Sequence, residues 1–140
     1  LNGDNDMMKE LFGEFLGTLI LILLGNGVVA GVVLPKTKSN NSGWIVITMG
    51  WGIAVAVAAF VSGTLSPAHL NPAVTFAMAL KGTLSWGSVF PYILAQFAGA
   101  MVVRFWFGCN SNRIMRQKKM QAISWQPSVL DRPSRIQFLT

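Results

Sequence analysis

The residues with the clearest chemical potential lie in one short segment, residues 69–75, which reads His-Leu-Asn-Pro-Ala-Val-Thr. Asn71 followed by Pro72 predicts a helix start, because the asparagine side chain can cap free backbone N–H groups and proline needs no N–H in the first turn. A helix that starts among apolar segments directs its positive end, and an amide donor, at whatever passes. This chemistry suits a pore. A pore of this kind normally needs two such segments, and the sequence holds one.

Catalytic and metal chemistry have few candidate residues in the sequence. One cysteine, Cys109, excludes an internal disulfide, and one histidine, His69, argues against a zinc site or a catalytic triad. No carboxylate pair, nucleophile–base set or phosphate-binding loop is present. We therefore expect neither an enzyme nor a cofactor or metal. The basic residues lack an aromatic platform pattern, so we expect no nucleic-acid partner.

Composition indicates lipid as the solvent. The chain has 140 residues, of which 52% are hydrophobic and 11% charged, whereas a soluble domain carries roughly a quarter charged residues. The net charge of +6 is uneven, because residues 1–103 sum to zero and residues 104–140 hold seven basic residues against Asp131. This change predicts a boundary near Val103. We expect residues 104–140 to be disordered, although the residues around 114–120 could also suit an anionic membrane surface.

Three apolar runs are long enough to position the helix start within a membrane. Residues 11–34, 44–61 and 89–107 can each cross, or nearly cross, a hydrocarbon core of about 30 Å. Residues 71–80 predict a helix of only about three turns. The predicted fold class is an all-α membrane protein with three transmembrane helices and one re-entrant half-helix. Small residues at helical contact spacing predict a tightly packed bundle; they are Gly13/Gly17, Gly27/Gly31, Gly50/Ala54/Ala58 and Ala95/Gly99.

Three groups of residues make the chain resemble the aquaporin and aquaglyceroporin (major intrinsic protein) family. Residues 13–18 (GEFLGT) resemble its first-helix motif, residues 66–77 (SPAHLNPAVTFA) its first pore loop, and residues 96–100 (QFAGA) its third helix. The likeness runs from about Met8 to Val103 and is to the glycerol-conducting branch. It implies the first of the two repeats that build the family's right-handed bundle.

The resemblance implies roles for the residues of the pore loop. In the family, two half-helices meet end to end at the bilayer midplane, and the asparagine amide donates hydrogen bonds to a passing hydroxyl or water. The positive helix ends repel cations. For this chain the resemblance implies a pore contact at the helix start, formed by Asn71, Pro72 and Ala73. It also implies that successive carbonyls line the path as acceptors; these belong to Pro67, Ala68, His69 and Leu70.

Two further residues have two interpretations each. From sequence alone, Glu14 could reach back to the membrane interface, whereas the resemblance implies a buried carboxylate that holds the pore loop extended. Trp51 by itself indicates packing or an interfacial belt. The resemblance instead implies a filter tryptophan, which favours glycerol and small uncharged solutes over water alone. We expect the imidazole of His69 to be structural.

We therefore expect a truncated subunit of a glycerol and water channel, which does not conduct alone because half of the pore wall is missing. The alternative is a membrane fragment without transport activity that is inert or interferes with assembly. The resemblance implies homotetramers in the plasma (inner) membrane, with several spans and a cytoplasmic N-terminus. The positive-inside rule would place the basic residues 104–140 in the cytoplasm instead. We expect that this conflict reflects a reading-frame shift just after Met101 or Val102.

Overall fold

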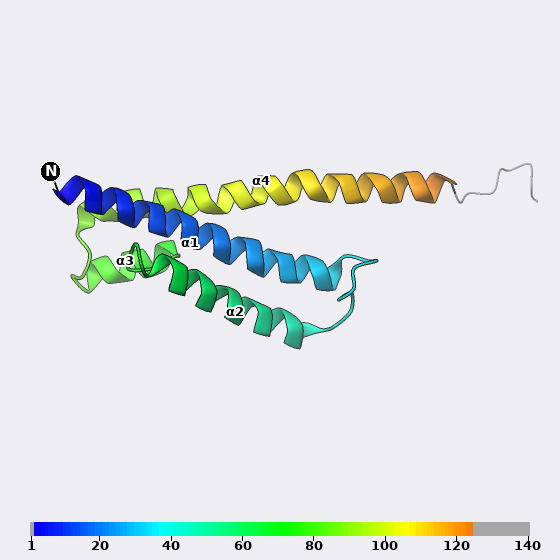
Figure 1. Cartoon of the computed structure of the whole chain (residues 1–140), viewed down its shortest axis with the longest axis horizontal. Helices are drawn as coiled ribbons and strands as arrows, with labels where there is room; N and C mark the ends of the chain where they lie inside the picture. Colours follow the sequence, from blue (N-terminus) through cyan, green and yellow to red (C-terminus); the bar gives the residue numbers. More distant parts are fainter. Residues whose placement is uncertain (1, 125–140) are drawn as a thin grey trace, which may run out of the picture. The chain divides into compact units, whose positions relative to one another are not determined.

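The computed structural model describes the backbone of residues 2–124 and the side chains of residues 5–109. This part of the chain contains four helices and no strand (Figure 1). They are α1 (Asn2–Val33), α2 (Trp44–Ser62), α3 (Pro72–Leu80) and α4 (Trp86–Ser124). The chain divides into two compact units, Leu1–Phe105 and Trp106–Thr140. The first unit contains every candidate site residue.

Three of the helices are long and apolar enough to cross a membrane. The segments are Asn5–Val33, Trp44–Ser62 and Trp86–Cys109. The fourth, α3, has nine residues and is about 14 Å long, which is half of a hydrocarbon core of about 30 Å. The predicted fold class, with three long apolar helices and one short helix, is confirmed.

The end of α4 differs from the sequence expectation. The third span was expected to end near residue 107 and to be followed by residues without regular structure, but α4 continues to Ser124. Residues 110–124 contain no proline or glycine and include two residues each of arginine, lysine, methionine and glutamine, all of which favour helix. Loss of hydropathy therefore ends the apolar span without ending the helix. Residues 125–140, on which the rest of this expectation falls, lie outside the described residues.

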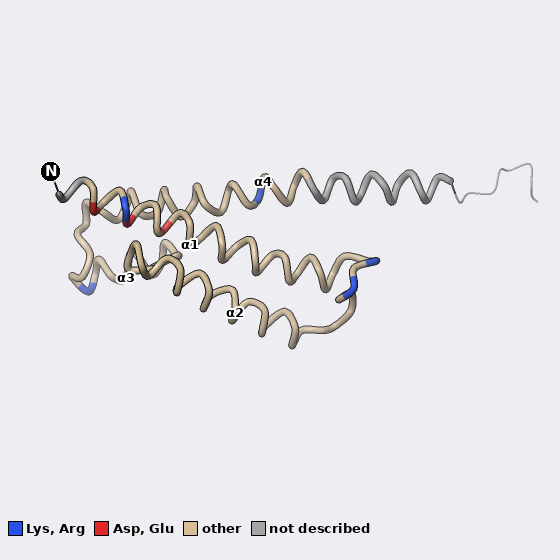
Figure 2. Tube along the Cα trace, viewed as in Figure 1, with Lys and Arg blue, Asp and Glu red and all other residues tan. Residues whose placement is uncertain are grey.

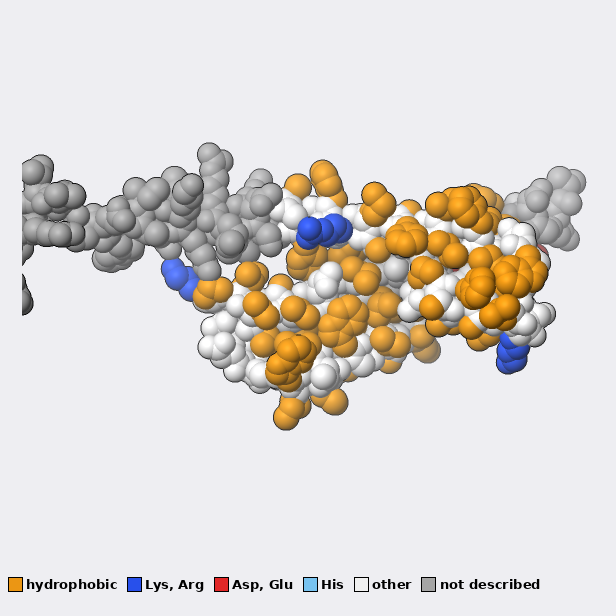
Figure 3. Space-filling model, turned by 180° about the vertical axis from the view of Figure 1, so that it is seen from behind, with side chains coloured by type: hydrophobic (Ala, Val, Ile, Leu, Met, Phe, Trp, Pro, Cys, Tyr) orange, Lys and Arg blue, Asp and Glu red, His pale blue; other side chains and the backbone are white. Residues whose placement is uncertain are grey.

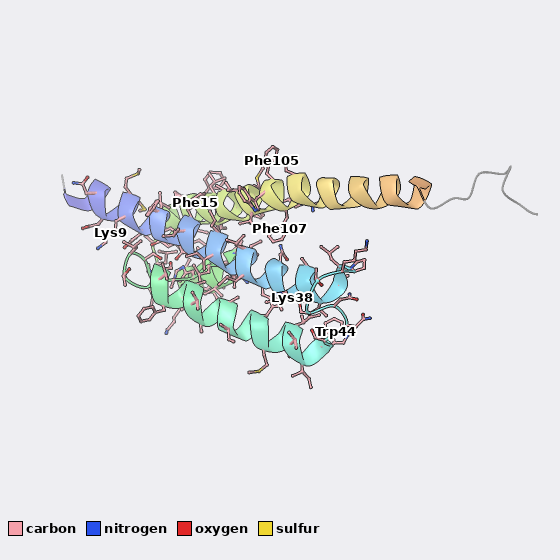
Figure 4. All side chains as sticks on the ribbon, turned by 45° about the vertical axis from the view of Figure 1, so that its right-hand side comes forward. Lys9, Phe15, Lys38, Trp44, Phe105 and Phe107 are labelled. Atoms are coloured by element: carbon pink, nitrogen blue, oxygen red, sulfur yellow. The ribbon has the colours of Figure 1, made fainter. Side chains whose placement is uncertain are left out.

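Helices α1 and α2 run antiparallel and pack through glycines (Figures 1 and 4). A Cβ atom added at Gly17 would lie 2.7 Å from Cβ of Ser62 at the end of α2, and one added at Gly50 would lie 2.6 Å from Cγ2 of Val28. Such distances leave no room for a side chain. The Gly27/Gly31 pair does not make a helix contact, because a Cβ at Gly27 would meet nothing within 4 Å.

Helix α4 runs parallel to α1 within the first unit. Tyr92 Oη donates to Glu10 Oε2 at 2.6 Å, and one turn further along both helices Gln96 Nε2 donates to Glu14 Oε2 at 2.8 Å. A Cβ at Gly99 would collide with the carbonyl oxygen of Phe15. At Gly99, one of the small residues predicted to lie at helix contacts, the backbones of α4 and α1 are therefore in close contact.

The outer surface of the first unit is apolar and its charges are few. Figure 2 shows the acidic positions on the first part of α1 and the lysines mainly near helix ends and in connectors. Figure 3 shows hydrophobic side chains over much of one face. Strongly exposed examples on α2 and α4 are Trp44, Ile45, Phe60, Phe90 and Phe105. Exposed apolar area of this extent is suited to contact with lipid tails.

Candidate functional site

The loop between α2 and α3 has an unusual backbone. Ala68 and Leu70 adopt positive φ angles of 54° and 53°, in the left-handed region where a side chain costs roughly 1–2 kcal/mol. Neither residue is a glycine that would relieve this cost. The loop must therefore be held by contacts with the rest of the first unit.

Glu14 of α1 provides these contacts. Its side chain is fully buried. Oε1 accepts hydrogen bonds from His69 N at 2.8 Å and Ser66 Oγ at 3.0 Å, and Oε2 accepts from Leu70 N and Gln96 Nε2, both at 2.8 Å. A carboxylate offers about four acceptor positions, and all of them are used. Of the two interpretations of Glu14, the structure has the buried carboxylate at the loop.

The direction of the loop carbonyls follows from these bonds. No peptide bond in the described residues is cis, so each C=O points opposite to the N–H of the same peptide. His69 N–H and Leu70 N–H point at Glu14, and the carbonyls of Ala68 and His69 therefore point away from it. Ala68 N–H donates to Ser66 Oγ at 3.1 Å, so the Pro67 carbonyl points away from this oxygen. Three successive acceptors are thus directed away from the groups that hold the loop.

The loop ends at the start of α3. Asn71 is the N-cap, with φ −154° and ψ 128°, and its Oδ1 accepts from Ala73 N at 2.8 Å while Pro72 occupies the first helical position. The expected helix start at Asn71 is confirmed. Capping uses the oxygen of the amide and leaves Nδ2 as a donor on an exposed residue. The positive end of the α3 dipole lies at the same place.

Sequence analysis missed a second layer of polar residues that ties this helix start to α4. Gln96 Nε2 also donates to Thr75 Oγ1 at 2.9 Å, and Thr75 Oγ1 donates to the carbonyl oxygen of Asn71 at 3.2 Å. At the end of α2, Ser62 Oγ donates to the Gly13 carbonyl at 2.8 Å. Gln96 belongs to a segment that carries the resemblance, but its type alone gave no sign of a role. For Thr75 a sequence signal exists: it lies four residues after Asn71, and residues at this spacing are neighbours on one face of a helix.

The imidazole of His69 and the indole of Trp51 make none of the hydrogen bonds to Glu14. The His69 imidazole is buried with its ring centroid 5.6 Å from that of Tyr92, and within the described residues its Nδ1 has no hydrogen-bond partner. Trp51 is half-buried on α2. It lies eleven residues before Ser62, which is about 16 Å along the helix axis. Along the axis of α2, Trp51 therefore lies well away from the residues that contact Glu14.

The described residues contain no group of three or more histidine, cysteine or acidic side chains that could hold a metal ion. The chemistry available at this site is hydrogen bonding: carbonyl acceptors, one amide donor and a helix N-terminus. Such a set can exchange hydrogen bonds with a small neutral solute and offers no carboxylate to bind a cation, because the four acceptor positions of Glu14 are occupied.

Comparisons with known proteins agree with this chemistry. Residues 3–129 match the family model described as "Major intrinsic protein". The chain is 88% identical over 96 residues to the "Glycerol uptake facilitator protein" of Streptococcus pneumoniae, covering 69% of this chain and 41% of that protein. It is 57% identical over 101 residues to "Glycerol uptake facilitator protein 3" of Lactiplantibacillus plantarum, covering 69% and 42%. The chain thus spans about two fifths of the length of these curated relatives.

A solved structure is also similar to this chain. The X-ray structure of the aquaglyceroporin from Plasmodium falciparum has a TM-score of 0.67 and 32% sequence identity, and the match covers 80% of this chain and 46% of that one. The family match extends to residue 129, past the expected boundary near Val103.

Proposed function

Because the chain belongs to the major intrinsic protein family, a family of membrane channels and not of enzymes, we propose that residues 1–103 form the first half of a channel. This channel lets glycerol, similar small neutral solutes and water cross the membrane passively. The names of the relatives support the choice of glycerol. The single observation that carries the proposal is the loop held by Glu14, which ends in the amide and positive helix end at Asn71.

A polyol fits this sequence of groups. Each hydroxyl of glycerol both donates and accepts a hydrogen bond. Donation goes to the carbonyls of Pro67, Ala68 and His69, which the trans peptides direct away from Glu14. Acceptance is from Nδ2 of Asn71, and the carbonyl of Leu70 is assigned to the same path. The positive end of α3 opposes the passage of cations.

Trp51 is assigned to a narrow point of the same path. Its indole presents an apolar face to the carbon backbone of a polyol, and the hydroxyls then require polar groups on the opposite wall. In the proposed channel, the second half supplies these polar groups. Without it, Asn71 and the loop carbonyls would face lipid at a cost of several kcal/mol for each unsatisfied group.

The 140-residue chain by itself is therefore proposed not to conduct, and to conduct once a complementary half is supplied. The competing proposal is a membrane polypeptide that has no transport activity and is inert or interferes with the assembly of intact subunits. The observation that supports this alternative is that the sequence contains one Asn-Pro-Ala segment, whereas a pore of this kind needs two.

Location and assembly follow from the family. The chain is a multi-pass membrane protein. We assign it to the plasma (inner) membrane with a cytoplasmic N-terminus, and as part of a homotetramer when both halves are present. Labelling of a cysteine introduced at Lys36, in the α1–α2 connector, tests the orientation once the exposed Cys109 is replaced by serine, because the proposal requires labelling from the outside only.

The function is tested in a two-part assembly, which we define as this chain reconstituted in liposomes with the remaining part of the pneumococcal relative. The proposal requires glycerol flux through this assembly and loss of the flux in Asn71→Leu, which removes the amide donor. The matched control is Thr48→Val, whose hydroxyl bonds only the Ile45 carbonyl of its own helix. Equal flux in the Asn71→Leu variant and its parent would refute the role of the helix start.

A further inference from the structure

The indole of Trp51 lies flat against the backbone of α1 at Gly25. A Cβ atom added at Gly25 would lie 2.6 Å from Cη2, 2.6 Å from Cζ3 and 2.7 Å from Cε2 of the indole. Cζ3 and Cε2 are opposite corners of the six-membered ring. Nearly equal distances to opposite corners place the added atom over the face of the ring and not at its edge. Gly25 thus leaves the space in which the ring face rests.

The contact is specific to Gly25. A Cβ atom added at Gly27, also on α1, would meet nothing within 4 Å. The same is true of Gly52 on α2, the residue after the tryptophan. Ordinary contact begins at 3.4 Å. With a methyl group at residue 25, the shortest distance from its carbon to an indole atom must therefore increase from 2.6 to 3.4 Å, a displacement of about 0.8 Å.

The ring yields more readily than the helices. One turn from this contact, Gly50 of α2 already packs against Val28 of α1, where an added Cβ would lie 2.6 Å from Cγ2 of the valine. Moving the helices apart would open this close-packed contact and lose its dispersion energy. Trp51 is only half-buried, so part of its side chain is not covered by neighbouring groups and the ring has room to move. A side chain at residue 25 therefore pushes the indole away from α1.

We infer that Gly25 is a specificity-determining residue, because the space it leaves sets how far the Trp51 indole extends into the solute path. This inference rests on the proposed function, in which Trp51 lines the path. A methyl group at residue 25 narrows the path by the displacement of the ring. Polyols, which need the width beside the indole, are affected more than water.

The test compares polyol and water flux in the two-part assembly. We expect Gly25→Ala to lower glycerol flux relative to water flux by about tenfold or more, the usual effect of one methyl group in a close-fitting site, and to lower erythritol flux further. Trp51→Phe, whose smaller ring removes the collision, is measured alone and combined with Gly25→Ala; we expect the two to have the same polyol-to-water ratio, because the methyl group at residue 25 then meets no indole. Gly27→Ala is the control and is expected to keep the parental ratio.

Every other result has a defined consequence for the inference. Equal loss of water and glycerol flux in Gly25→Ala, or the same change of ratio in Gly27→Ala, would show a packing role only and overturn it. If Gly25→Ala passes no water at all, the double variant decides: flux equal to that of Trp51→Phe alone supports the collision with the indole, and continued loss of flux overturns the inference. A parental assembly that passes no solute would overturn the proposed function itself, together with the filter role of Gly25. A conducting parent with an unchanged ratio in Gly25→Ala would overturn the role of Gly25 alone.

Discussion

Replacing Glu14 with glutamine tests how the pore loop is held. Each carboxylate oxygen accepts one backbone N–H, from His69 or from Leu70, and one side-chain donor. In Glu14→Gln one oxygen becomes an NH₂ group that faces two donors. Ser66 and Gln96 can turn to offer an oxygen instead, but the backbone N–H of His69 or Leu70 cannot.

The expected cost follows from these contacts. One buried backbone donor is left without a partner in either orientation of the new amide, at about 1–3 kcal/mol. If Gln96 turns its oxygen toward residue 14, its bond to Thr75 is broken, and if Ser66 turns, its bond to Ser62 is disturbed. A second loss of about 1–3 kcal/mol follows. We expect Glu14→Gln to lower the free energy of unfolding by about 2–6 kcal/mol.

The control is Glu10→Gln, one turn earlier on α1. Glu10 accepts one bond, from Tyr92 Oη, and is only half-buried. The amide oxygen of glutamine can still accept this bond, so the expected loss is below about 1 kcal/mol.

The measurement is unfolding of the chain in detergent micelles by a denaturing detergent, followed by helical circular dichroism. Limited proteolysis of residues 63–71 reports the loop separately, and we expect faster cleavage in Glu14→Gln. An unchanged midpoint and cleavage rate in Glu14→Gln, or an equal loss in Glu10→Gln, would refute the account of the loop.

Three further predictions concern the α1–α4 contact, the Thr75 hydroxyl and the coding DNA. Gly99→Ala places a methyl group against the Phe15 carbonyl oxygen and is expected to lower the free energy of unfolding by about 1–3 kcal/mol; Gly87→Ala, where a Cβ would meet nothing within 4 Å, is the control, and equal effects would contradict the close α1–α4 contact. Thr75→Val removes the hydroxyl between Gln96 and the Asn71 carbonyl and is expected to cost about 1–3 kcal/mol and to reduce glycerol flux in the two-part assembly; Thr64→Val, whose hydroxyl bonds only the carbonyl of Val61, should change neither quantity. A reading-frame shift after Met101 or Val102 predicts that the coding DNA, translated downstream in another frame, continues the third helix and encodes a second Asn-Pro-Ala segment; absence of both from the other two frames would refute it.

The parts of the fold that could be predicted from sequence depend on neighbouring residues. A run of apolar residues specifies a spanning helix through its length, and Asn71-Pro72 specifies a helix start through capping and ring geometry. The structure has three long apolar helices and a helix that begins at Pro72. The apolar span of α4 agrees with the sequence prediction to within two or three residues at each end, whereas residues 104–124, which their charge and polarity predict to be disordered, continue α4 because residues 110–124 favour helix.

The contacts that were not predictable join residues far apart in the chain. The left-handed backbone of Ala68 and Leu70 carries no glycine signal and exists because Glu14, more than fifty residues earlier, binds the loop. The two bonds of Gln96 become visible only when α1, α3 and α4 are placed together. The contact between the Trp51 ring and Gly25 likewise becomes visible only when α1 and α2 are placed together. Residue types allow these contacts, and only the packing of the helices selects them.

The central claim is that this chain supplies one half of a glycerol channel and needs the other half to conduct. Its most direct test is glycerol flux into liposomes that contain the 140-residue chain alone, the complementary part of the pneumococcal relative alone, or both together. The account predicts flux only when both are present, with loss of flux in Asn71→Leu. Rapid glycerol equilibration with this chain alone, or no flux with both parts correctly inserted, would contradict it.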